Sequence, residues 1–281
     1  MPFIPNAESD REEMLQEIGK RSVEELFSDV PARRRFPKLK LPRALSEQEV
    51  LREIGAMAAK NRGADKVSWF LGAGIYNHFI PALVPALASR GEFLTAYTPY
   101  QPEVSQGTLQ AIFEYQSMAA RLFGVSVVNA SHYDGATALA EAALMAWKLD
   151  EGRDKILLPE DLHPEYKAVL ETYFSSFDVK IAEYRGTPED AGVDERCACL
   201  VAGYPCFSGE LHGLGRAAER AHAAGALFIV HADPLMCALL ESPGAQGADI
   251  VVAEGQSLGN PMNFGGPGLG MMGATEKLMR R

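Results

Sequence analysis

The chain has 281 residues, enough for one large domain with an arm, and its 47% hydrophobic and 23% charged residues are typical of a globular protein. A formal net charge of -10 argues against nucleic acid as a partner, because neutralising phosphates needs clustered lysines and arginines. No apolar stretch approaches the roughly 20 residues of a membrane span, and the first residues lack the pattern of a secretory signal. Four scattered cysteines are too few for a disulfide framework, which indicates a reducing cytoplasm.

The pair Cys197 and Cys199 could suggest a metal site. The pair opens an apolar run with the pattern of a buried strand, where cysteine acts as a small hydrophobic residue. Neither a second cysteine pair nor a nearby histidine pair completes a zinc set. We therefore expect no metal.

Residues 1–62 are predicted to form a helical N-terminal arm. Two amphipathic helices, around Asp10–Ile18 and over Glu47–Ala59, are separated by an extended stretch rich in proline and arginine. Ser46 followed by Glu49 is the pattern of a capping box at the start of the second helix. A helix–linker–helix arm of this kind usually packs on a neighbour rather than folding alone.

Residues 63–281 are predicted to form one large domain, in which strands alternate with helices. Such alternation indicates an α/β fold with a mostly parallel sheet and helices on both faces. The strands are nearly continuous apolar runs, as expected for strands that are buried on both faces. They are expected at 126–130, 155–158, 179–184, 199–204, 227–231 and 250–253, and helices at 109–122, 137–149, from 164 onward and at 216–224. Ser105 is expected to cap the first of these helices, and Gly225 to end the last as a C′ glycine.

A turn between a strand and a helix contains Gly135, Ala136 and Thr137. Its backbone N–H groups and the Thr137 hydroxyl would lie at a helix N-terminus, an arrangement that suits a phosphate. Asp134 could equally be an ordinary N-cap of that helix. Both interpretations stay open at this point.

His231 and Asp233 follow an apolar strand and should lie at the carboxyl edge of the sheet, where ligands bind in α/β folds. A carboxylate there can hold a pyridine nitrogen protonated. The alternative is an aspartate that caps a turn, with Pro234 following it.

Two loops have the composition of binding surfaces. The segment 97–107 concentrates aromatic and amide side chains, and the segment 255–268 is rich in Gly, Asn and Pro. Gly72 and Gly74 lack the third glycine of a dinucleotide fingerprint. The residues expected at an interface are Tyr97, Tyr100, Gln101, Glu103, Gln106, Asn260 and Asn263.

Taken together, these segments resemble the glycine cleavage system P-protein, glycine dehydrogenase (decarboxylating), and within it the alpha chain, subunit 1, of the form split into two polypeptides. The stretches that carry the resemblance run in order along the whole chain, at 3–6, 70–76, 97–107, 133–138, 163–165 and 264–268. The resemblance implies the large domain of a fold-type-I pyridoxal phosphate (PLP) enzyme without the C-terminal small domain. One departure is at Cys206 and Ser208, where alpha chains usually carry Asn and Phe.

On the family pattern, Asp233 falls at the pyridinium partner and Gly135–Thr137 at the phosphate turn, while Gln256 occupies the position of the Schiff-base lysine. A Schiff base needs an amine that can lose its proton, and an amide nitrogen is not nucleophilic. No lysine lies between Lys180 and Lys277. We therefore expect no catalytic residue and no covalent PLP in this chain.

The preferred interpretation is a non-catalytic alpha subunit. The resemblance implies a beta subunit (subunit 2) that carries the lysine and PLP, decarboxylates glycine and passes the aminomethyl group to the lipoyl H-protein, in a heterotetramer. In isolation the chain could also form a homodimer. The alternative is a stand-alone regulatory protein that holds a PLP-like ligand non-covalently in a degenerate pocket of Gly135, Ala136, Thr137, His231 and Asp233. A lyase using Cys237 or His231 as nucleophile is disfavoured, because neither has an obvious paired base.

Overall fold

The computed structural model describes residues 6–94 and 97–280, so the matching stretch at 3–6 lies mostly outside the described residues. The chain divides into two compact units, with the boundary between Gly63 and Ala64. Within the described residues, no helix has both the length and the apolar character needed to cross a membrane.

The first unit contains two α-helices, α1 (Glu8–Glu17) and α2 (Glu47–Ala58), and two short 3₁₀ helices, η1 (Val23–Phe27) and η2 (Ala32–Arg34). None of the described residues in these helices is buried.

The capping box at the start of α2 is confirmed. The Ser46 hydroxyl accepts from the Glu49 N–H, and the Glu49 carboxylate accepts from the Ser46 N–H at 2.8 Å. The expectation of an amphipathic first helix is wrong, because the apolar residues of α1, Met14 and Leu15, are adjacent in sequence and form no stripe along the helix.

The second unit is built on a seven-stranded sheet with the order β1-β7-β6-β5-β4-β2-β3. Strands β2 to β6 run parallel to one another, whereas β7 pairs antiparallel with both β6 and β1. The predicted α/β fold with a mostly parallel sheet is therefore confirmed. The strands are β1 (Val127–Val128), β2 (Lys155–Pro159), β3 (Lys180–Tyr184), β4 (Cys197–Tyr204), β5 (Leu227–Ala232), β6 (Ile250–Glu254) and β7 (Gly270–Ala274).

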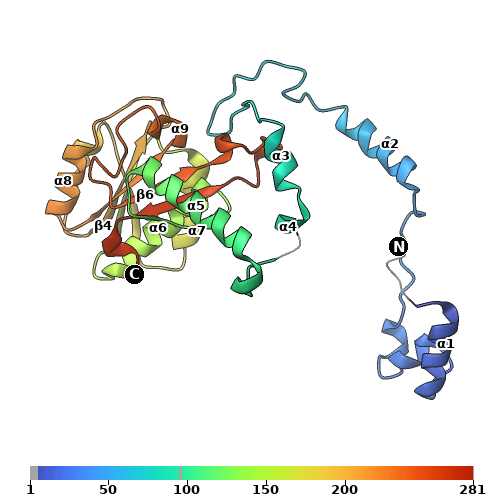
Figure 1. Cartoon of the computed structure of the whole chain (residues 1–281). Helices are drawn as coiled ribbons and strands as arrows, with labels where there is room; N and C mark the ends of the chain where they lie inside the picture. The colour runs from blue at the N-terminus through green and yellow to red at the C-terminus, as the bar shows by residue number, and fades with distance from the viewer. Residues whose placement is uncertain (1–5, 95–96, 281) are drawn as a thin grey trace. The chain divides into compact units, whose positions relative to one another are not determined.

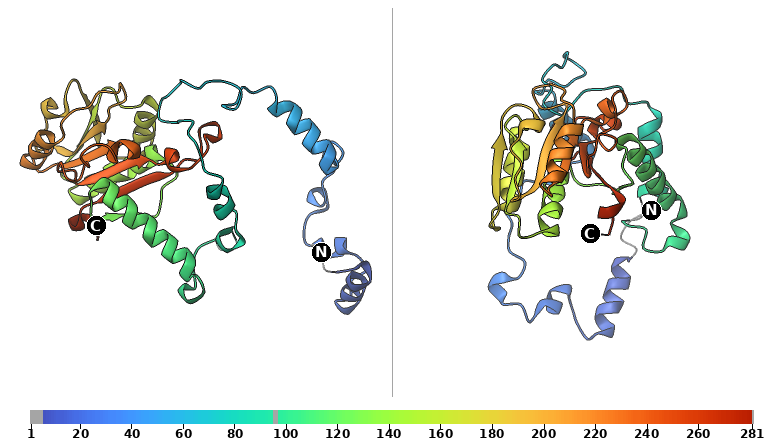
Figure 2. Two further views of the ribbon diagram at one scale, coloured as in Figure 1. Left: turned by 45° about the horizontal axis from the view of Figure 1, so that its top comes forward. Right: turned by 90° about the vertical axis from the view of Figure 1, so that its left-hand side faces the viewer.

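Helices cover both faces of this sheet, as Figures 1 and 2 show. The first face is packed by α5 and α8, and the second face by α6 and α7. The α-helices of this unit are α3 (Leu83–Ala88), α4 (Gly91–Leu94), α5 (Gln106–Phe123), α6 (Gly135–Leu149), α7 (Pro164–Phe174), α8 (Gly215–Ala223) and α9 (Pro234–Cys237), and the 3₁₀ helices are η3 (Pro102–Val104), η4 (Pro188–Asp190), η5 (Gln256–Leu258), η6 (Asn263–Gly265) and η7 (Glu276–Leu278).

Strand β4, in the interior of the sheet, is buried along its whole length, and its side chains alternate between the two cores. Leu200 and Ala202 pack on the side of α5 and α8, while Cys199 and Val201 pack on the side of α6 and α7. This alternation is the two-residue period of a strand covered on both faces. Cys199 therefore acts as a packing residue, as the sequence predicts.

Helix ends follow the sequence with one exception. The helix α8 ends before Gly225, which adopts a positive φ of 75° as a C′ glycine does. Ser105 occupies the N-cap of α5, but its side chain makes no capping hydrogen bond, so the predicted serine cap is wrong. With φ near -114° and ψ near 20°, Ser105 lacks the extended backbone that capping serines adopt.

Candidate functional site

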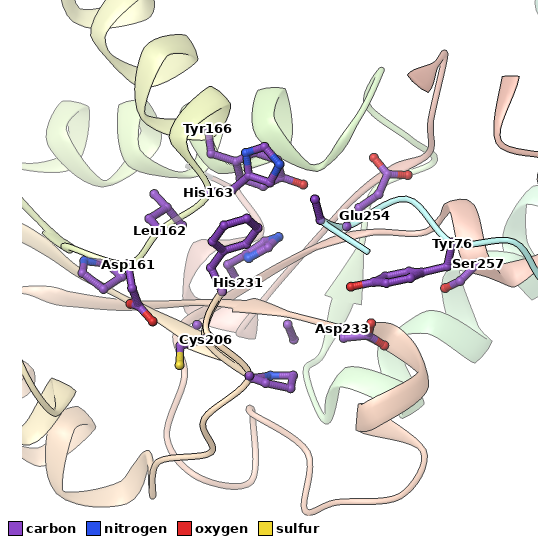
Figure 3. A pocket seen from close by; sticks show the side chains of 18 residues that line it. Tyr76, Asp161, Leu162, His163, Tyr166, Cys206, His231, Asp233, Glu254 and Ser257 are labelled. Carbon is purple, nitrogen blue, oxygen red and sulfur yellow. The ribbon is translucent and has the colours of Figure 1, made fainter. Parts of the chain in front are cut away.

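A pocket opens at the carboxyl ends of the parallel strands, the edge where ligands bind in α/β folds. His231 and Asp233 line it from the end of β5, Glu254 from the end of β6, and Tyr166 from α7 (Figure 3). Tyr76, from the segment before α3, closes another side. The volume of about 190 Å³ lies below the ~300–1,000 Å³ usual for small-molecule pockets.

The N-terminus of α6 is where the sequence predicts a phosphate turn, and the structure does place Gly135, Ala136 and Thr137 there. The Asp134 carboxylate accepts from the Thr137 N–H at 2.7 Å, so Asp134 is an ordinary N-cap. The Gly135 N–H donates to Glu254 Oε2 at 2.9 Å. Carboxylates of the chain itself therefore occupy N–H groups that a phosphate would need.

Glu254 is the residue that fills this position, and the sequence reasoning missed it. Besides Gly135, its carboxylate accepts from the backbone N–H of Gln256 at 2.9 Å and of Leu269 at 2.8 Å. A Cβ at Gly268 would lie 2.5 Å from Glu254 Oε2, so a side chain there would displace the carboxylate from its hydrogen bonds. The Glu254 carboxylate thus connects the start of α6, the segment after β6 and the residue before β7. The available signal was an acidic residue ending an otherwise apolar strand.

Gln256 is buried, with 2% of its surface exposed. Its Oε1 accepts from the Tyr76 N–H at 3.0 Å, and its Nε2 donates to the Tyr76 carbonyl at 3.1 Å and to the Asn260 carbonyl at 2.7 Å. The amide therefore joins the segment before α3 to the loop after β6. An ammonium could make the two donations but could not accept from Tyr76, so this environment fits an amide and not a lysine.

Aromatic rings line the α7 side of the pocket. Tyr166 and His231 are 4.8 Å apart between ring centroids, and His163 lies 4.8 Å from Phe207. Burial, and to a smaller extent the nearby His163, lower the pKa of His231 to about 4. Its Nε2 is buried without a hydrogen-bond partner among the described residues. His231 is thus a neutral ring near pH 7.

Asp233 caps the short helix α9. Its Oδ1 accepts from the Leu235 N–H at 2.8 Å and from the Met236 N–H at 3.2 Å. Asp233 therefore caps the turn that follows β5, which is the second of the two interpretations from the sequence. The same side chain lines the pocket, but half of its hydrogen-bonding capacity is committed to α9.

PLP, the cofactor that the resemblance implies, does not fit the residues present. Its aldehyde needs an amine, and the equivalent position holds the fully bonded amide of Gln256. Its phosphate needs free N–H groups at the start of α6, and Glu254 already places a negative charge there. These contacts disfavour the stand-alone PLP-binding alternative.

The nucleophiles weighed from the sequence are also unsuited to catalysis. Burial, together with the charge of Asp233, raises the pKa of Cys237 to about 12, so its thiol stays protonated near neutral pH. The buried ring of His231 has no partner at Nε2 that could activate it.

The residues expected at an interface lie largely on the surface. Tyr97 and Tyr100 are 91% and 78% exposed, and Gln101, Glu103, Gln106 and Asn263 are exposed as well. Asn260 is half-buried, and its carbonyl accepts a hydrogen bond from Gln256 Nε2. The neighbouring Phe264 is 95% exposed. Aromatic rings exposed to this extent are unusual on a surface that faces only water.

A second polar cluster consists of Cys206, Glu210 and His212, beside the pocket wall. The prediction of no metal rests on the lack of paired cysteines and histidines. It misses this cluster, whose spacing is Cys-x₃-Glu-x-His. Burial raises the pKa of the Cys206 thiol, although a hydrogen bond with Ser208 opposes the shift.

Comparison with known proteins identifies the family of this chain. The family model of the glycine cleavage system P-protein matches residues 1–281. The chain is 49% identical over 288 positions to a protein of Thermomicrobium roseum named probable glycine dehydrogenase (decarboxylating) subunit 1, and 46% identical over 289 positions to one of the same name from Desulforamulus reducens. All of the chain is covered, but it spans only 64% and 65% of those relatives.

Among solved structures, a glycine decarboxylase (P-protein) of the glycine cleavage system in inhibitor-bound form matches with a TM-score of 0.91 and 47% identity, covering 100% of this chain and 64% of that one. A sphingosine-1-phosphate lyase of Burkholderia pseudomallei, at 16% identity and a TM-score of 0.61, shares the fold alone, over 88% of this chain and 63% of that one. The chain belongs to the glycine cleavage system P-protein family.

Proposed function

We propose that this chain is the non-catalytic alpha subunit, subunit 1, of a two-chain glycine dehydrogenase (decarboxylating). The observation that carries the proposal is the Gln256 side chain, a buried amide with three backbone hydrogen bonds at the position where the family fold needs an amine. Relatives that are 46–49% identical carry the name of subunit 1, which supports the same assignment.

The partner is a beta subunit, subunit 2, that carries the lysine and PLP. In the complex, glycine is decarboxylated on that subunit and the aminomethyl group passes to the lipoyl arm of the H-protein. We place the complex in the cytoplasm, because all four cysteines of this chain are unpaired, as they would be in a reducing compartment.

Each unit offers its own surface to the partner, the arm in the first unit and the two exposed loops in the second. Tyr97 and Tyr100 supply rigid aromatic area, the kind of side chain that dominates interface energies. In α2, Leu51, Ile54 and Met57 are each more than half exposed at helical spacing. In the complex, this apolar stripe within the arm of residues 1–62 would be buried against the partner. The loop residues of this interface are Tyr97, Tyr100, Gln101, Glu103, Gln106, Asn260 and Asn263.

The test is reconstitution. Each chain is purified alone, and release of carbon dioxide from glycine is measured with PLP and lipoyl H-protein for this chain, for the lysine-bearing chain and for the mixture. Turnover is expected from the mixture and none from this chain alone. PLP-dependent turnover by this chain alone would overturn the proposal. A mixture in which the partner's Schiff-base lysine is replaced by alanine is the matched control, and it should be inactive.

A further inference from the structure

The chain makes a tight turn after β4 that returns Glu210 beside Cys206. The Cys206 N–H donates to the Glu210 carbonyl at 3.0 Å, and the Gly209 N–H donates to the Cys206 carbonyl at 2.9 Å. Two residues later, His212 Nε2 lies 3.5 Å from Glu210 Oε2. One thiol, one carboxylate and one imidazole, each with a ligand atom within 4.8 Å of the others, therefore meet on a single turn.

Glycines allow this turn its path. A Cβ at Gly203 would lie 2.7 Å from the Cys206 Cα, so a side chain there would push the turn outward. Gly209 has a φ of +91°, a conformation that other residues rarely adopt. The position of Cys206 is thus set by backbone geometry, and its side chain is 9% exposed at the floor of a hollow.

Further oxygen atoms lie next to these three ligand atoms. The Ser208 hydroxyl is 3.1 Å from Cys206 Sγ and donates to Asp161 Oδ2 at 2.9 Å. Asp161, Cys206, Ser208, Glu210 and His212 all line the same hollow. No lysine or arginine forms an ion pair with Asp161 or Glu210 among the pairs recorded for the described residues.

Sulfur, imidazole and carboxylate donors are the set that Zn²⁺ takes in proteins, usually four in a tetrahedron. Ligand atoms of such a tetrahedron lie roughly 3.3–3.8 Å apart, given bond lengths of about 2.0–2.3 Å. A separation of up to 4.8 Å is therefore about an ångström too wide. The 3.5 Å between His212 Nε2 and Glu210 Oε2 already matches such an edge, so any shortening on metal binding concerns the distances to Cys206 Sγ.

We propose that Cys206, Glu210 and His212 form a Zn²⁺ site, completed by Asp161 or by water. The ion would tie the turn after β4 to the end of β2, where Asp161 lies, and so brace the wall that Cys206 and Asp161 share with the pocket. The proposal does not depend on the glycine dehydrogenase assignment.

The test uses the untagged full chain, stripped of metal with a chelator and titrated with Co²⁺, which reports thiolate ligation by a charge-transfer band in the near ultraviolet. One Co²⁺ per chain is expected, with that band and the intense visible bands of tetrahedral cobalt, and stoichiometric Zn²⁺ should displace it. Cys206→Ala should abolish the charge-transfer band. His212→Gln should weaken binding at least tenfold while keeping the band at saturating Co²⁺.

Matched controls are Cys237→Ala, which removes a different buried thiol, and His222→Ala, which removes a half-exposed histidine paired with Asp249. Both should bind Co²⁺ as the unmodified chain does. Circular dichroism verifies that each variant is folded, and His212→Gln alters only a partly exposed side chain, so it remains informative if Cys206→Ala unfolds. Absence of a thiolate band in the unmodified chain, or a band that survives Cys206→Ala, would overturn the proposal.

Discussion

The Glu254 carboxylate accepts a hydrogen bond from the Gly135 N–H at 2.9 Å, and so a negative charge of the protein lies at the N-terminus of α6. The family resemblance implies a cofactor phosphate at this place. A helix N-terminus attracts anions because its N–H groups are unpaired and its dipole is positive there. Glu254 supplies such an anion from the protein itself, and nearby Gln256 joins the segment before α3 to the loop after β6.

Replacing Glu254 tests how much of the fold depends on this charge. Glu254→Ala leaves the N–H groups of Gly135, Gln256 and Leu269 without an acceptor, so we expect a loss of about 2 kcal/mol or more in the free energy of unfolding. Glu254→Gln keeps one carbonyl oxygen and should lose less. Urea unfolding followed by fluorescence measures both. An alanine variant as stable as the unmodified chain contradicts the structural role.

Restoring the amine should not restore cofactor binding by itself. With Gln256→Lys, borohydride reduction after incubation with PLP should trap no more imine than incubation with pyridoxal, because Glu254 denies the phosphate its site. In the unmodified chain, neither PLP nor pyridoxal should become attached at Gln256. Mass spectrometry of the peptide that contains position 256 provides the measurement.

The double variant Gln256→Lys, Glu254→Ala is the control for that experiment, and here PLP should label better than pyridoxal. A single Gln256→Lys variant that prefers PLP many-fold would show that the phosphate site is open.

His231 should make stability depend on pH. Its folded pKa of about 4 lies below the ordinary 6.5, so between these values the unfolded chain binds a proton that the folded chain does not. Stability should thus be undiminished above pH 6.5 and should fall as the pH decreases toward 4, by at most about 3 kcal/mol. The groups facing the ring are Tyr166 and His163.

The measurement is the free energy of unfolding in urea at several pH values for the unmodified chain and for His231→Phe, which keeps an aromatic ring without the proton. Above pH 6.5, the free energies of unfolding of the two proteins should differ by a constant amount. Parallel curves from pH 4 to 6.5 refute the assignment.

The exposed tyrosines should matter for the complex and not for the fold. Tyr97→Ala and Tyr100→Ala are each expected to weaken binding to the lysine-bearing subunit about tenfold, which corresponds to about 1.4 kcal/mol. Their thermal stability should be unchanged, because neither side chain is packed. Calorimetric titration gives the affinity. Phe177→Ala, at a 40% exposed aromatic outside both loops, is the control and should bind normally.

Local patterns in the sequence predicted most of the elements. The capping box at Ser46 and the glycine after α8 stand where expected, because these signals act between residues a few positions apart. The buried parallel strands were recognised from continuous apolar runs, since burial on both faces leaves no polar positions. The serine cap of α5 and the amphipathic character of α1 were wrong.

The sequence by itself determined the α/β fold and the absence of an amine at position 256, because composition and side-chain chemistry require no knowledge of neighbours. Only the tertiary structure decided that the protein's own side chains occupy the hydrogen-bonding groups at this edge of the sheet. Glu254 meets Gly135 across 119 residues, and Gln256 meets Tyr76 across 180. Such contacts depend on the order and register of the strands, which bring distant chain segments to one edge of the sheet, and short-range patterns contain no information on that order.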